Sequence, residues 1–118
     1  MEWNPYGGKM SQISESDTPH PHRTGYKFKI QYWYYYPNTA VPLQEFYDFM
    51  AQYASQSPRE AYLNYRDLDV GTNGNGEDPN IFGARYFKGN FARLRKVKTQ
   101  CDPGNFFRNE QSIPPLSA

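Results

Sequence analysis

The chain has 118 residues, which is enough for one small domain or for a piece of a larger one. Its 13 Lys and Arg residues nearly balance 12 Asp and Glu residues, and the net charge of +1 gives no electrostatic case for nucleic-acid binding. No apolar run reaches membrane-spanning length, and a single cysteine, Cys101, excludes an internal disulfide and a multi-cysteine metal site.

The first third of the chain predicts a loop followed by one long strand. Residues 1–23 are loop-like because they are rich in Pro, Gly and Ser, and only residues 9–13 favour a short strand. Residues 24–36 alternate as a two-faced strand does. Its apolar face carries Tyr26, Phe28, Ile30 and Tyr32, and its mixed face carries Lys27, Lys29, Gln31 and Trp33.

The middle of the chain predicts a helix and then another strand. From Pro42 to Ser57-Pro58, apolar residues recur at the i, i+3, i+4, i+7 spacing of an amphipathic helix. Residues 60–66 alternate again, which predicts a half-buried strand. Such a strand places Tyr62 and Asn64 on one face and Leu63 and Tyr65 on the other. Residues 71–76 contain two Asn-Gly pairs and predict a loop.

Two helices and a tail are expected in the last third. Asp78-Pro79 is a typical helix start, and Asn90 is placed to cap a second helix whose basic run, residues 93–98, forms a solvated face. Asp102-Pro103-Gly104 ends that helix. The following aromatic pair, Phe106 and Phe107, is expected to anchor the tail.

The polar residues of segment 62–69 are the most informative local feature. An Asn inside a strand is locally unfavourable, and a buried amide needs hydrogen-bond partners. A ligand could supply partners for Asn64, and so could the backbone of a neighbouring loop, which is the commoner case. Arg66, Asp67 and Asp69 favour a structural network at the strand end. His20 and His22 lie in a Pro-rich loop without a ligand partner at metal-binding spacing.

Several blocks of the sequence, taken in order, resemble the C-terminal region of the berberine bridge enzyme-like flavoproteins of plants. They are residues 3–10, 13–16, 21–23, 62–69, 86–91, 97–99 and 105–116. The resemblance implies that residues 1–118 form a single C-terminal substrate domain whose FAD-binding domain lies outside this chain. With the patterns above, it predicts an α+β fold: a partial antiparallel sheet of about three strands, helices on one face, and C-terminal helices and a tail.

The resemblance also implies roles for five residues. Tyr65 matches the proposed catalytic base of the cannabinoid synthases, and Asn64 matches a position expected to contact the flavin or its domain. Lys29 and Gln31 match inward-facing positions, and Lys29-Ile30-Gln31 is the pattern of the monolignol-oxidising members, in which the lysine stabilises a phenolate. Tyr62 is expected to line the substrate cleft or to pack beneath it.

The expected function is the C-terminal part of an FAD-dependent oxidoreductase. It would oxidise an alcohol, monolignol-like or carbohydrate, to an aldehyde or lactone by hydride transfer to the flavin. The alternative is a truncated module without turnover, and the chain alone is expected to be inactive in either case. The partners implied are the FAD-binding domain and a small alcohol, with no nucleic acid and no membrane, and the family suggests secretion. Cys101 is interpreted as an ordinary thiol, not a flavin attachment point.

Two points stay open at the level of the sequence. On the residues alone Lys29 is better interpreted as a surface lysine that extends its ammonium to water from a two-faced strand, whereas the resemblance favours a position in the cleft. Asn64 and Tyr65 are adjacent, and adjacent residues of an ideal strand face opposite ways. Both can therefore serve one cleft only if the strand twists, bulges or ends between them.

Overall fold

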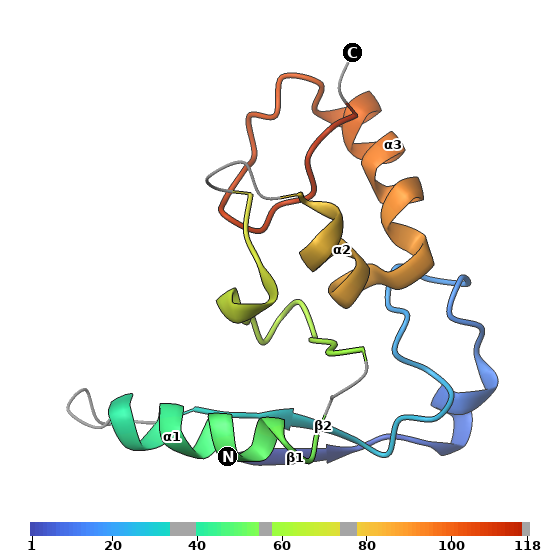
Figure 1. The fold of residues 1–118 in the computed structure, drawn as a ribbon. Helices are drawn as coiled ribbons and strands as arrows, with labels where there is room; N and C mark the ends of the chain where they lie inside the picture. Colours follow the sequence, from blue (N-terminus) through green and yellow to red (C-terminus); the bar gives the residue numbers. More distant parts are fainter. Residues whose placement is uncertain (34–39, 55–57, 74–77, 117–118) are drawn as a thin grey trace.

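A small antiparallel sheet and one helix form one side of the molecule (Figure 1). The computed structural model describes residues 1–33, 40–54, 58–73 and 78–116. Strand β1 (Glu2–Pro5) pairs with β2 (Phe28–Gln31) from Glu2↔Gln31 to Pro5↔Phe28. Helix α1 (Ala40–Ala51) lies beside this sheet, and the Tyr32 ring at the end of β2 contacts two of its aromatic side chains.

The buried core lies on the other side, around two helices. Helix α2 (Asn80–Phe87) continues through the 3-10 turn η3 (Lys88–Asn90) into helix α3 (Phe91–Cys101). Two further 3-10 turns are η1 (Gly8–Gln12) and η2 (Leu68–Val70). The core consists of Val70, Phe82, Tyr86, Phe87 and Phe91. The two helices approach closely at Gly83, where an added Cβ would lie 2.4 Å from the Phe91 ring.

The tail after α3 turns back toward α2 and is held by polar contacts (Figure 1). Gln111 is 2% exposed; its amide donates to the carbonyls of Asp67 and Gly71, both at 2.7 Å, and its oxygen accepts from the Tyr86 hydroxyl. Because Tyr86 also accepts from the Asp67 amide, helix α2, the tail and the segment before η2 meet at one buried point.

The α+β class is confirmed, but the sheet has two strands in the described residues and not about three. Residues 60–66, predicted as a strand, form coil and a turn in which the Tyr65 amide donates to the Tyr62 carbonyl at 2.8 Å. The Ala61 amide donates to the Arg85 carbonyl of α2, and the Asn64 side chain donates to the Tyr62 hydroxyl. The alternating pattern of this segment therefore does not reflect hydrogen bonding to a neighbouring strand. The prediction of a strand over 60–66 is therefore wrong.

Strand β1 lies in a segment that was predicted to be a loop. Residues 2–5 form β1 because β2 offers a partner more than twenty residues away, which no local pattern reveals. Residues 9–13, favoured as a short strand, instead contain the turn η1. Of the predicted strand 24–36, only Phe28–Gln31 is a strand among residues 24–33, while residues 34–36 lie outside the described part of the chain. Phe28 is 52% exposed and meets Trp3 edge to face, so the expected apolar face does not build the core.

The three predicted helices are present, with corrections at their ends. Helix α1 begins at Ala40 and ends at Ala51, and residues 55–57 of the expected helix lie outside the described residues. Asn90 precedes α3 as predicted, but its side chain makes no cap and donates to the carbonyls of Glu15 and Thr18. No helix within the described residues is long and apolar enough to cross a membrane.

Two expectations about the C-terminal region are wrong. Phe106 and Phe107 do not anchor the tail, because they are 77% and 75% exposed. The basic run of α3 is only partly a solvated face. Arg95 donates to the carbonyls of Pro114 and Pro115, and Lys98 binds Asp102 and the Phe107 carbonyl, so these two cations hold the tail against α3.

Candidate functional site

An open cleft of about 1450 Å³ lies between the sheet with α1 and the coil that leads into η2. Strand β2 contributes Lys29 and Gln31 from one face, and α1 contributes Tyr47. The opposite wall is the irregular segment 58–69. Tyr6 and Lys88 also line the cleft, so its walls come from several separate stretches of the chain and carry both aromatic rings and charges.

One cation stands over two phenol rings in this cleft. The Lys29 ammonium lies 4.4 Å from the centre of the Tyr65 ring and 4.6 Å from that of the Tyr62 ring. The two rings meet edge to face with their centres 5.3 Å apart. Each contact of this kind contributes about 0.5–1 kcal/mol at an exposed site and more when water is excluded. Lys29 is half-buried, and its ammonium is directed at the two rings.

The turn at 62–65 removes the conflict between Asn64 and Tyr65. Because the chain reverses direction there, both residues line the cleft although they are adjacent. Asn64 is exposed, and its Nδ2 donates to the Tyr62 hydroxyl at 2.8 Å. The structure thus brings all five sequence-predicted site residues to one cleft: Lys29, Gln31, Tyr62, Asn64 and Tyr65. Their chemical roles remain predictions.

The carboxylate of Asp67 accepts hydrogen bonds from several residues at one end of the segment 58–69. Its Oδ2 accepts from the Tyr47 hydroxyl at 2.8 Å and from the Arg59 guanidinium at 2.6 Å, and its Oδ1 accepts from the Asp69 amide. Arg59 also lies over the Tyr47 ring, 4.9 Å from its centre. Arg66 pairs with Glu110 at 2.9 Å. Segment 66–69 is accordingly a structural network, as its composition favoured.

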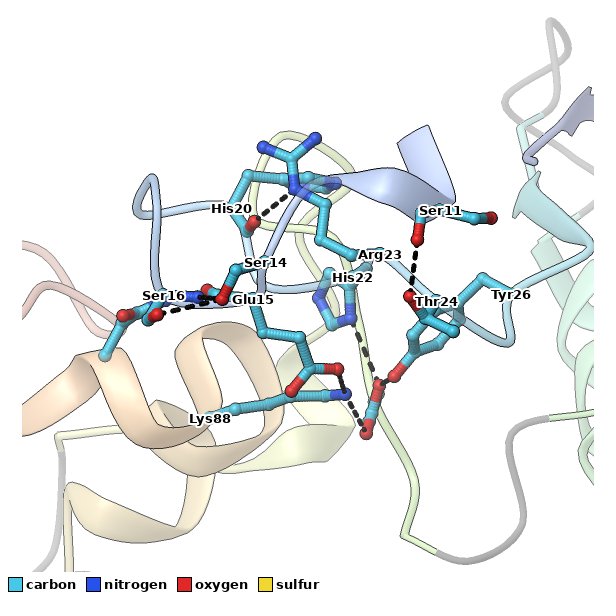
Figure 2. Close-up of polar contacts among 12 residues, drawn as sticks. Ser11, Ser14, Glu15, Ser16, His20, His22, Arg23, Thr24, Tyr26 and Lys88 are labelled. Carbon is cyan, nitrogen blue, oxygen red and sulfur yellow. Dashed lines mark hydrogen bonds and ion pairs between the residues drawn. The ribbon is translucent and has the colours of Figure 1, made fainter. Parts of the chain in front are cut away.

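A polar cluster that the sequence patterns did not predict lines the same cleft beside the two phenols. His22, Tyr26 and Lys88 all contact the carboxylate of Glu60, whose side chain is 12% exposed. Figure 2 shows these three side chains directed toward one point. Burial, and then the hydrogen bond to Glu60, raise the pKa of Tyr26 from 10.0 to about 12. Burial alone would lower the pKa of Lys88, but hydrogen bonds with Glu15 and Tyr26 and the charge of Glu60 raise it above its usual value. The signals in the sequence were two blocks of the family resemblance, residues 21–23 and 86–91, which contain His22 and Lys88.

Among the described residues, no group of three or more His, Cys, Asp or Glu side chains is placed to hold a metal ion. Cys101 is exposed at the end of α3. Fold and site together define an α+β segment that presents phenols, a cation and amides to one open cleft.

Comparison with known proteins places this segment in a family. The family model described as Berberine and berberine like matches residues 61–114. Monolignol oxidoreductase AtBBE-like 13 from Arabidopsis thaliana is 53% identical over 119 residues, covering 95% of this chain and 22% of the relative. The chain belongs to the berberine bridge enzyme-like family, which is a family of FAD-linked oxidoreductases.

Solved structures agree with this assignment. BBE-like #28 from Arabidopsis thaliana superposes with a TM-score of 0.84 at 40% identity, over 98% of this chain and 27% of that one. Phl p 4, a grass pollen allergen with glucose dehydrogenase activity, gives a TM-score of 0.78 at 44% identity, over 98% of this chain and 26% of that one. The chain spans about a quarter of the length of the relatives it matches.

Proposed function

We propose that this chain forms the substrate-facing wall of an FAD-dependent oxidoreductase that oxidises an alcohol to an aldehyde or lactone. The observation that carries the proposal is the Lys29 ammonium over the Tyr62 and Tyr65 rings in an open cleft. Oxidation of an alcohol requires a base for the hydroxyl proton as well as a hydride acceptor. The phenols and the cation supply the first of these requirements.

Each site residue has a distinct part in the proposal. Tyr65 receives the proton of the substrate hydroxyl. To accept that proton Tyr65 must be a phenolate, and the Lys29 ammonium, 4.4 Å from the centre of the ring, attracts the negative charge that the phenolate carries before the transfer. Gln31, two residues further along β2, offers an amide for orienting the substrate. Tyr62 borders the cleft and is bonded through its hydroxyl to Asn64.

FAD and its binding domain are the proposed partners. When bound, FAD supplies the hydride acceptor. The described residues fit one edge of such a group: Asn64 is exposed at the rim of the cleft and presents an amide to it. The shape of the chain also supports a partner surface. Its radius of gyration is 15.8 Å, whereas an independent domain of this length would have about 13.5 Å.

The proposed substrate is a monolignol-like or carbohydrate alcohol. Lys29-Ile30-Gln31 resembles the pattern of the monolignol-oxidising members, and one relative is named a monolignol oxidoreductase. A second relative is described as a glucose dehydrogenase. A cation over aromatic rings suits a phenolic substrate, because it stabilises a phenolate.

The test is a chimera in which this chain replaces the corresponding segment of Monolignol oxidoreductase AtBBE-like 13. We expect it to bind flavin and to oxidise alcohols. Tyr65→Phe should then lower kcat by at least about 100-fold, because it removes a general base, while the flavin absorbance spectrum stays unchanged. Lys29→Met should lower turnover in the same direction.

Lys27→Met is the matched control, since Lys27 is exposed and does not line the cleft. Unchanged turnover of Tyr65→Phe would remove Tyr65 as the base. A chimera that holds flavin but oxidises neither a monolignol nor a sugar would favour the alternative of an inactive module.

A further inference from the structure

We propose that His22 is a positioning residue that fixes the irregular segment 61–65, and with it the Tyr62 and Tyr65 rings beneath Lys29. The inference deepens the proposed function and rests on it for its catalytic consequence. Its structural content is independent of that function. In this proposal His22 takes no part in the chemical step. It positions the phenols through its contacts with the backbone of Ala61 and the carboxylate of Glu60.

Both ring nitrogens of His22 face acceptors. Nδ1 lies 3.1 Å from Glu60 Oε2, and Nε2 lies 2.8 Å from the Ala61 carbonyl oxygen. A carboxylate and a carbonyl both accept, so a ring nitrogen of His22 that carries a proton donates to the residue that it faces. His22 is 6% exposed, and water therefore has little access to replace either partner. The ring thus contacts two consecutive residues, Glu60 and Ala61, where the chain enters the segment.

The Glu60 carboxylate is itself fixed by side chains from other elements, of which Figure 2 shows Tyr26 and Lys88. The Tyr26 hydroxyl donates to Oε2, and the Lys88 ammonium lies 3.5 Å from Oε1 and 2.7 Å from Glu15. Lys88 has a φ of +48°, which is costly for a residue with a side chain. Such a conformation persists where its contacts over-determine it, and these two carboxylates provide those contacts.

Two further ionisable residues, His20 and Arg23, belong to the loop that carries His22. The His20 ring meets it edge to face at 5.4 Å and also meets Tyr62 at 5.5 Å. Burial, and then the charges of His22 and Arg23, lower the pKa of His20. Arg23 is buried and bound to Thr18 and to the His20 carbonyl. The loop that carries His22 is accordingly well anchored and can act as a fixed support.

These contacts constrain the backbone of Ala61, which directly precedes Tyr62. Its carbonyl accepts from His22, and its amide donates to the Arg85 carbonyl at 3.3 Å. With both backbone groups held, the chain enters the turn at Tyr62 in one orientation. Segment 61–65 has no helix or strand hydrogen bonds of its own beyond the single turn contact, so this support decides where the rings lie.

Hydrogen exchange on the 118-residue chain tests the structural part. His22→Phe keeps a planar ring but removes both ring nitrogens, and we expect exchange of the Ala61 and Tyr65 amides to accelerate by roughly tenfold or more. His22→Gln retains one amide donor for the Ala61 carbonyl and should recover part of the protection. It also serves as the second variant if His22→Phe does not fold.

Asn90→Leu is the matched control. Asn90 is 7% exposed and also donates two hydrogen bonds to the N-terminal loop, but at Glu15 and Thr18, away from the site. It should accelerate exchange at the Asp17 amide, which bonds to Ser14, and leave Ala61 and Tyr65 protected. Equal effects of both variants on Ala61 and Tyr65 would overturn the proposal.

The chimera separates this inference from the proposed function. If both hold, His22→Phe lowers kcat with flavin spectrum and substrate KM little changed, and His22→Gln restores part of kcat. Faster exchange at Ala61 with unchanged kcat would overturn the catalytic consequence of His22 while leaving the proposed base open to the Tyr65→Phe test. Unchanged exchange in His22→Phe would overturn the positioning role outright.

Discussion

At the scale of single residues, Glu60 shows how one buried carboxylate can determine the behaviour of its neighbours. A hydrogen bond from Tyr26 to Glu60 favours the neutral phenol, and burial acts in the same direction. The folded-state pKa of Tyr26, about 12, therefore lies above the value of 10.0 for a free phenol. Neutral Tyr26 stabilises the fold below about pH 10, and that contribution is lost as the pH rises toward 12.

An alkaline titration checks this assignment. The ultraviolet absorbance of the folded chain should show a phenol that ionises near pH 12, and Tyr26→Phe should remove that late step. The free energy of unfolding should also fall less steeply between pH 10 and 12 in Tyr26→Phe than in the wild type. Tyr53→Phe removes a phenol that is 71% exposed and should leave the late step in place. A late step that survives Tyr26→Phe would show that another phenol causes it.

At the scale of elements, the junction of α2 and α3 carries the core. Gly83 lies in α2 directly against the Phe91 ring, and Phe91 stacks on Phe87 with the ring centres 6.1 Å apart. A side chain at position 83 would separate the helices, because 2.4 Å is far below a van der Waals contact. The close approach of two helices here depends on the absence of a single methyl group.

Gly83→Ala should accordingly destabilise the chain although alanine favours helix formation. Overpacking of this kind costs about 1–3 kcal/mol, which outweighs the helix-propensity gain of up to about 1 kcal/mol. Gly89→Ala is the control, since a Cβ there meets nothing within 4 Å. Urea denaturation followed by circular dichroism measures both changes. A Gly83→Ala chain as stable as Gly89→Ala would contradict the close packing of α2 on Phe91.

At the scale of the whole molecule, the chain leaves large apolar groups in water. Phe106 and Phe107 are 77% and 75% exposed and pack mainly on each other, edge to face at 5.0 Å. Its dimensions of 44 × 38 × 24 Å describe an open shape with the core at one side. Exposed aromatic pairs of this kind mark contact surfaces or aggregation sites.

The isolated chain should therefore self-associate. Replacing the aromatic pair, Phe106→Ser with Phe107→Ser, should lower the associated fraction in sedimentation velocity, because it removes the two most exposed of the large apolar side chains in the described residues. Val97→Ser is the control, since Val97 is a single aliphatic side chain that is 48% exposed. A wild-type chain that sediments as a monomer at every concentration tested would refute the prediction.

Elements that depend on residues close in the sequence were predicted correctly, and elements that depend on a distant partner were not. Helices α2 and α3 were predicted because apolar spacing and helix-start residues are signals within one or two turns of the chain, although neither helix has a side-chain cap at its N-terminus. The predicted strand 60–66 failed because alternation describes a side-chain pattern, not the presence of a neighbouring strand. Strand β1 was missed for the converse reason, since Glu2–Pro5 acquires its conformation from β2.

The candidate site divides in the same way. Its five residues were identified from short motifs, because the residue types themselves carry the family resemblance. Their arrangement could not be predicted from those motifs. Lys29 comes over the Tyr62 and Tyr65 rings only because the segment 61–65 turns, and His22 contacts that segment across 39 residues of sequence.

The sequence by itself determined the family, the α+β class, the helices and the identities of the residues at the cleft. These depend on local spacing and on residue type, which the chain carries without folding. Only the tertiary structure decided that the sheet has two strands in its described part and that Tyr62 to Tyr65 form a turn. It alone also showed that His22, Tyr26 and Lys88 all contact the carboxylate of Glu60. Each of these depends on burial and hydrogen bonding between residues distant in sequence, where only the folded chain brings the partners together.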